Sequence, residues 1–198
     1  PGIVLATVLA VAVVLSLPQI VYFARQPEML AYRADQVSVL NSGVNEGDLA
    51  GTLAANAWRL LRAPVWKGDN SWYHNLSGRA VFDPLVAIGF LVGLALVARD
   101  LASRRGARAN AAAVLVVAAS VVALVPSWLS VGAPNYVRLT ATWPALFLVA
   151  AYGLDRLAAA GERRSRAGRW IVPAVLAVSA VSSAGDYFGR YAERVIER

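Results

Sequence analysis

Long apolar runs alternate with polar connections along this chain of 198 residues. Five runs contain no Asp, Glu, Lys, Arg or His: Ile3–Phe23, Pro84–Ala98, Ala109–Val125, Leu139–Leu154 and Trp170–Ala184. Only the first reaches the roughly 20 residues that cross a hydrocarbon core of about 30 Å. The other four are shorter, and they need a flanking turn or snorkelling arginines to span it. The pattern predicts an all-α, polytopic membrane helix bundle of about five transmembrane helices, the first in residues 1–23 and the others in 84–184.

The longest polar connection covers residues 24–83. Gln26-Pro27-Glu28 predicts a chain break after the first span, because a residue before proline is pushed out of the α region. Asn41 to Gly47 has the composition of a turn-rich loop. Asp48 can cap an amphipathic helix over residues 48–62, whose apolar face includes Leu53 and Leu60. This helix either lies on the membrane surface or packs against the outer rim of the bundle, and the sequence favours neither.

Charge indicates which side of the membrane each connection occupies. The chain is 58% hydrophobic, with a mean hydropathy of +0.54 and a net charge of +7. Nine arginines and three acidic residues in Arg99–Arg108 and Asp155–Arg169 account for +6 of that charge. Because these arginines flank apolar runs, they indicate cytoplasmic loops and explain the basic pI without nucleic acid. Alternation then makes the N-terminus cytoplasmic, and it makes 24–83, 126–138 and the tail 185–198 extracytoplasmic.

Candidate chemistry concentrates in the stretch from Lys67 to Pro84, where hydrogen-bonding side chains are interleaved with aromatic rings. Such a mixture suits a sugar, which has hydroxyl edges and apolar faces, and Lys or Arg suits a phosphate. Any well-ordered external loop could have the same composition. Asp69 and Asp83 are expected to be solvated or to cap helices. His74 could act as a general base by residue type, but a structural hydrogen bond from its ring is favoured. One histidine and no cysteine disfavour a His-based metal site.

Four stretches together resemble the C-terminal half of a bacterial polyprenyl-phosphate-dependent glycosyltransferase of the GT-C superfamily. The similarity is to the family 39 (protein-mannosyltransferase-like) and aminoarabinose-transferase-like enzymes. The stretches are Gln26-Pro27-Glu28 with Tyr32 to Ser38; Gly68-Asp69 with His74 to Arg79 and Asp83-Pro84; Arg138 six residues before Pro144; and Asp186-Tyr187-Phe188 with Tyr191-Ala192. The family commonly has proline where this chain has Ser77.

The resemblance implies an integral membrane enzyme that transfers a sugar from a lipid-linked phosphate donor to an acceptor at the extracytoplasmic face. Arg138 is the first donor or phosphate contact expected from this resemblance, and snorkelling at the membrane interface is the equal alternative for its side chain. The second-choice contacts are Arg79, Lys67 and His74. The expected sugar or acceptor contacts are Asp69, Trp72, Tyr73 and Asn75. The family's catalytic carboxylate lies in a first external loop that has no counterpart here. The chain opens on Pro-Gly without an initiator Met, so we expect it to be part of a longer protein, and we name no catalytic residue.

The other expectations are broader. An Ala/Val/Arg-rich composition is typical of a bacterial protein, and we expect a multi-pass protein of the cytoplasmic membrane. Its partners would be the lipid-linked donor and membrane lipids, with no nucleic acid. No cofactor is evident; a divalent metal, the sugar, the acceptor and the oligomeric state stay open. A transporter or channel module, or a non-catalytic membrane subunit, is the alternative. Transport is disfavoured because ionisable groups mark transport paths and the five spans have none.

Overall fold

The computed structural model describes residues 2–103 and 107–196, and these residues form helices, turns and loops without any β-strand. They divide into two units, Pro1–Leu49 and Ala50–Arg198. The first contains α1 (Gly2–Arg25), α2 (Pro27–Val37) and α3 (Ser42–Asn45). The second contains α4 (Leu49–Arg62), α5 (Pro84–Ala102), α6 (Ala107–Trp128), α7 (Trp143–Glu162), α8 (Ile171–Gly185) and α9 (Ala192–Ile196). Two short 3₁₀ segments, η1 (Thr140–Thr142) and η2 (Arg166–Trp170), and a π-helix, η3 (Asp186–Tyr191), complete it.

In the first unit, the predicted break after the first helix is present, and one longer helix that was not predicted follows it. α1 ends at Arg25, and the predicted break at Gln26 is confirmed. Pro27 then begins α2, which the sequence analysis missed. The segment predicted as a turn-rich loop contains the single turn of α3, capped by the Asn41 side chain, which accepts a hydrogen bond from the backbone N–H of Gly43 at 2.9 Å.

The prediction of about five transmembrane helices is wrong in number. The described residues contain three helices that are long and apolar enough to cross a membrane: Pro84–Ala102, Ala111–Trp128 and the continuous helix Arg166–Arg194. They include the predicted spans 84–98, most of 109–125, and 170–184. These three helices indicate a helical membrane protein, as predicted.

The other two predicted spans do not meet this description. Residues 3–23 lie in α1, whose described apolar part is the shorter segment Leu9–Arg25. Residues 139–154 do not form one α-helix, because the 3₁₀ segment η1 precedes α7. Thr142, the last residue of η1, is fully buried. The apolar run of α7 also ends at Leu154, where Asp155 and Arg156 follow within the same helix.

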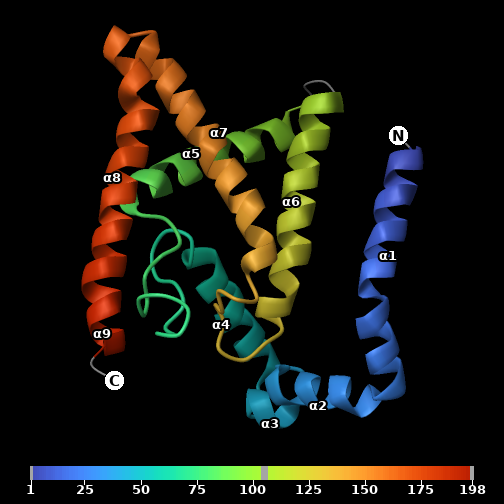
Figure 1. Cartoon of the computed structure of the whole chain (residues 1–198). Helices are drawn as coiled ribbons and strands as arrows, with labels where there is room; N and C mark the ends of the chain where they lie inside the picture. Colours follow the sequence, from blue (N-terminus) through green and yellow to red (C-terminus); the bar gives the residue numbers. More distant parts are fainter. Residues whose placement is uncertain (1, 104–106, 197–198) are drawn as a thin grey trace. The chain divides into compact units, whose positions relative to one another are not determined.

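The core of the second unit is the crossing of α5 over α7 (Figure 1). Glycines allow the two backbones to touch: a Cβ on Gly93 would overlap the Val149 carbonyl oxygen, and one on Gly153 would overlap the Gly89 carbonyl oxygen. Gly89 and Gly93 are four residues apart, the small-xxx-small spacing that permits close helix packing in membranes. Phe82, Val86, Phe90, Val149 and Ala150 surround the crossing.

Asp83 is the N-cap of α5, and it also connects this helix to α8 through a side-chain hydrogen bond. Its Oδ1 accepts hydrogen bonds from the backbone N–H groups of Leu85 at 3.0 Å and Val86 at 3.2 Å, and Pro84 occupies the first turn. The other carboxylate oxygen accepts a hydrogen bond from the Ser179 hydroxyl of α8. The capping role expected for Asp83 is therefore confirmed.

α4 begins directly after Asp48, as predicted, and packs against the end of α6. The buried Asn56 side chain donates to the carbonyl oxygens of Trp128 at 3.0 Å and Ser130 at 3.1 Å. In return, the Trp128 indole N–H donates to the Leu53 carbonyl oxygen at 3.0 Å. The packing alternative is thus realised on one face of the helix. Contact of the other face with a membrane stays a prediction.

The loops of the second unit gather at two ends. In Figure 1, the turn between α7 and α8, the last turn of α5 and the first turn of α6 lie in the upper part of the view. The loop 63–83 and the segment 129–142 lie in the lower part. The arginine-rich turn between α7 and α8 is thus at one end of this unit, and the candidate chemistry is at the other.

Candidate functional site

The loop 63–83 is closed on itself by backbone hydrogen bonds. Val81 donates to the Ala63 carbonyl oxygen at 3.1 Å, and Gly68 donates to that of Gly78 at 3.1 Å. Gly78 has a φ of +77°, in the left-handed region that favours glycine. A Cβ on Gly68 would overlap the Tyr136 hydroxyl, so glycine is required where the loop touches the segment 129–142.

The Asp69 carboxylate is the centre of this contact. Asp69 is only 4% exposed. Oδ1 accepts from the Ser71 backbone N–H at 2.8 Å, and Oδ2 accepts from the Tyr136 backbone N–H at 3.0 Å and contacts the His74 ring Nδ1 at 3.0 Å. Asp69 is therefore buried rather than solvated, and it holds the loop in place. The structural hydrogen bond favoured for His74 is confirmed.

Tyr136 completes the contact from the other side. Its hydroxyl donates to the Arg79 carbonyl oxygen at 2.6 Å, and its ring packs edge-on against Trp143 at 5.7 Å between centroids. Burial of the phenol, opposed in part by a hydrogen bond with the backbone of Asp69, raises the pKa of Tyr136 to about 12. The hydroxyl therefore remains a donor over the whole physiological range.

Arg79 connects the loop to the helix that contains α8 and η3. Its Nε lies 3.0 Å from Oδ2 of Asp186, and its Nη2 donates to the Ser183 hydroxyl at 3.1 Å. The other oxygen of Asp186 contacts Nη1 of Arg190 at 3.1 Å. Asp186 is thus shared between two arginines, which leaves a net positive charge at this position.

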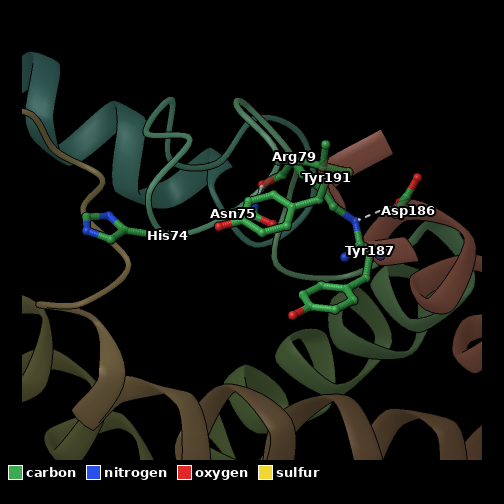
Figure 2. Close-up of a pocket in the computed structure, with 7 residues that line it drawn as sticks. His74, Asn75, Arg79, Asp186, Tyr187 and Tyr191 are labelled. Atoms are coloured by element: carbon green, nitrogen blue, oxygen red, sulfur yellow. Dashed lines mark hydrogen bonds and ion pairs between the residues drawn. The ribbon is translucent and has the colours of Figure 1, made fainter. Parts of the chain in front are cut away.

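A pocket of about 200 Å³ opens where the loop meets η3. Its lining comes from the loop (His74, Asn75, Leu76 and Arg79) and from η3 (Asp186, Tyr187 and Tyr191). Figure 2 shows Arg79, Asp186, Tyr187 and Tyr191 grouped together, whereas the His74 ring points away from them. The rings of Tyr187 and Tyr191 are stacked, with centroids 5.6 Å apart. A π-helical segment in the wall is itself a feature that often occurs at functional sites.

The pocket brings together only some of the residues that the sequence analysis singled out. Asn75 and Arg79 line it, and the Asn75 amide donates to the Arg79 carbonyl oxygen at 3.1 Å. Trp72 does not line it, and the Arg194 guanidinium lies over the Trp72 ring at 4.7 Å from the ring centroid. Lys67 is exposed, and Tyr73 is 85% exposed; neither lines the pocket.

Arg138 lies in the segment 129–142 and is not part of the pocket lining. Its Nη1 donates to the Val131 carbonyl oxygen at 3.1 Å, and its backbone N–H donates to the Asn135 side chain at 3.2 Å. These contacts close a turn that includes the left-handed Gly132. Arg138, the first phosphate contact expected from the sequence, and Arg79, a second-choice contact, are therefore in different local environments.

The η3 half of the pocket was not predicted from the sequence. Asp186, Tyr187 and Tyr191 entered only as part of the family resemblance and were not named as site residues. The one signal available was the i, i+4 spacing of Tyr187 and Tyr191, which places the two rings on one side of a helix. Pairing that side with Arg79 requires the fold.

The described residues provide no group of three or more His, Cys, Asp or Glu side chains that could hold a metal ion. No model of a known protein family matches the chain, and no curated protein or solved structure is significantly similar to it.

Proposed function

We propose that this chain is the C-terminal part of an integral membrane glycosyltransferase that uses a polyprenyl-phosphate-linked sugar donor at the extracytoplasmic face. The observation that carries the proposal is the position of the pocket. It lies between a polar loop and the end of a helix, Arg166–Arg194, that is apolar and long enough to cross a membrane. A donor with a lipid tail and a sugar phosphate head requires such a junction of polar and apolar surfaces.

The pocket chemistry suits the sugar part of the donor or acceptor. The rings of Tyr187 and Tyr191 provide flat apolar surfaces for the faces of a sugar ring. Arg79 and Asn75 provide donors, and the Asp186 carboxylate provides an acceptor for hydroxyl groups. Because both carboxylate oxygens of Asp186 already contact arginines, it is a poor candidate for the catalytic base.

The helix beside the pocket suits the lipid part. None of the residues of α8 is buried in the described structure, and its exposed side chains include Leu176, Val178 and Val181. Phe188, in η3, extends this exposed apolar surface to the level of the pocket. A polyprenyl chain could lie along this surface while its phosphate approaches Arg79.

The test measures sugar transfer in the membrane protein that contains this chain, reconstituted with polyprenyl-phosphate-linked sugars. Tyr191→Ala removes one ring from the pocket, and Arg79→Ala removes the guanidinium. Loss of about 1–2 kcal/mol of donor binding raises KM roughly 5- to 30-fold. The matched control is Tyr73→Ala, which removes an exposed ring that does not line the pocket. Wild-type transfer by both pocket variants would refute the proposal.

A further inference from the structure

A second pocket lies at the opposite end of the second unit, on the turn between α7 and α8. It is a groove of about 460 Å³, lined by Leu157, Ala160, Gly161, Arg163 and Arg164. One wall is apolar and the other has two guanidinium groups. The pocket at η3 has a different lining.

The turn is built so that its arginines face outward. A Cβ on the buried Gly168 would overlap the backbone of Gly161 and Glu162, so η2 returns directly against the end of α7. The Ser165 side chain caps η2 by accepting from the Ala167 backbone N–H at 3.2 Å. With backbone packed against backbone, the long side chains of the turn have no interior position available.

The arginines of this turn are not neutralised by acids. In the part of the chain that the structure describes, no ion pair within 4 Å involves Arg156, Arg163, Arg164, Arg166 or Arg169. Arg156 and Arg169 lie over the rings of Tyr152 at 5.2 Å and Trp170 at 5.5 Å. The local acids are Asp155 and Glu162, so residues 155–169 have five positive and two negative charges, a net +3. The excess remains available to an external anion.

The position of the groove identifies the kind of anion. The membrane-length helix Arg166–Arg194 begins at this turn, so the groove is at the depth where a span leaves the hydrocarbon. Phospholipid headgroups lie at that depth. The apolar wall continues down α7 through Leu157, where an acyl chain could lie.

We infer that this groove binds an anionic phospholipid, with its phosphodiester between Arg163 and Arg164 and an acyl chain along Leu157 and Ala160. Guanidinium groups hold phosphate oxygens in a planar, two-point geometry, and basic pockets between membrane helices suit anionic headgroups. The bound lipid would fix the α7–α8 turn at the membrane surface. The inference is independent of the proposed function, since it involves neither Arg79 nor the pocket at η3.

Native mass spectrometry of the purified protein in detergent, with equal amounts of phosphatidylglycerol and phosphatidylcholine, tests this inference. The wild type should retain phosphatidylglycerol in preference. The double variant Arg163→Gln/Arg164→Gln should bind it roughly 10- to 30-fold more weakly, since each basic residue near an anionic surface contributes on the order of 1 kcal/mol. The charge-matched control Arg25→Gln/Arg59→Gln removes two exposed arginines elsewhere and should behave as the wild type.

Two results would overturn the inference. One is equal retention of phosphatidylglycerol by the wild type and the Arg163→Gln/Arg164→Gln variant when thermal unfolding shows both to be folded. The other is full displacement of the lipid by excess inorganic phosphate, which would identify the groove as a site for a free anion. Because the readout is lipid retention and not sugar transfer, failure here leaves the proposed function untouched.

Discussion

The Arg79 guanidinium and the Asp186 carboxylate form an ion pair, with Nε 3.0 Å from Oδ2, that joins the polar loop 63–83 to the helix Arg166–Arg194. Both side chains are largely withdrawn from solvent, at 30% and 19% exposed. The same arginine donates to Ser183 one turn earlier. This pair forms the polar base of the pocket, and its two residues are more than a hundred positions apart in sequence.

A double-mutant cycle measures the strength of this link. Arg79→Ala, Asp186→Ala and the double variant should give a coupling energy of about 1 kcal/mol in thermal unfolding, the upper range for a pair that retains some solvent contact. The Arg190→Ala and Asp186→Ala cycle is the control, because Arg190 is 77% exposed and its coupling should be close to zero. Equal coupling in the two cycles would contradict the assignment of Arg79 as the structural partner.

The Asp69 carboxylate should be needed for the loop to fold. In Asp69→Asn, an NH₂ group replaces one of two oxygens that accept from Ser71, Tyr136 and His74. At least one buried donor then faces another donor, a cost of about 1–3 kcal/mol. The variant should unfold at a lower temperature, and trypsin should cleave sooner after Lys67 and Arg79. Asp155→Asn, at an exposed site, is the control and should change neither.

Because of Tyr136, we expect the folded protein to lose stability at high pH. Its pKa is raised from 10.0 to about 12 in the folded protein, so the protonated hydroxyl stabilises the fold fully below pH 10. That stabilisation, up to about 2–3 kcal/mol, is lost as the pH rises from 10 through 12. Tyr136→Phe should be less stable at neutral pH, because it lacks the hydrogen bond to Arg79, and should lose less stability over this range. Tyr73→Phe should keep the wild-type pH dependence, since Tyr73 is exposed.

The crossing of α5 and α7 should not tolerate side chains at its glycines. Gly153→Val would push a branched side chain into the Gly89 carbonyl, and the backbones would have to separate. Overpacking of this kind costs about 1–3 kcal/mol or more, and it should lower the unfolding temperature in detergent. Gly185→Ala is the control, because a Cβ there meets nothing within 4 Å. Similar unfolding temperatures for the two variants would show that the backbones are not in contact.

Local sequence signals predicted the helix boundaries well. Asp83-Pro84 begins α5 because aspartate caps and proline fits the first turn, and α4 starts after Asp48 and ends at Arg62 as expected. α2 was missed because its residues, Pro27–Val37, contain no apolar run, and its leading proline was interpreted only as a break.

The number of spans and the pocket could not be predicted in the same way. An apolar run does not distinguish contact with lipid from contact with protein: Val149 and Ala150 of α7 are buried against α5, although their composition suits a lipid-facing position. Gly89-x-x-x-Gly93 was a usable signal for that packing and was overlooked. The pairing of Arg79 with Asp186 depends on how α8 returns past the loop, and no local pattern encodes it.

One face of α4 is buried against the protein and the other is exposed. Asn56 and Leu60 are buried on the packed face, while Trp58 and Leu61 on the other face are 64% and 73% exposed. The packed face is bonded to Trp128, where a membrane-length helix ends, so the exposed face is at the depth of an interface. Tryptophan beside arginine suits that depth.

The chain contains no cysteine, so single spin labels can be introduced at chosen positions. In lipid nanodiscs, a label at Leu61→Cys on α4 should be accessible to oxygen and protected from a water-soluble nickel complex, because oxygen partitions into lipid. A label at Tyr73→Cys, exposed on the polar loop, should show the opposite preference. Equal exposure of both labels to the nickel complex would mean that α4 only packs on the rim of the bundle. Lipid contact at Leu61 would place the pocket at η3 close to the membrane surface, within reach of a donor that remains anchored by its tail.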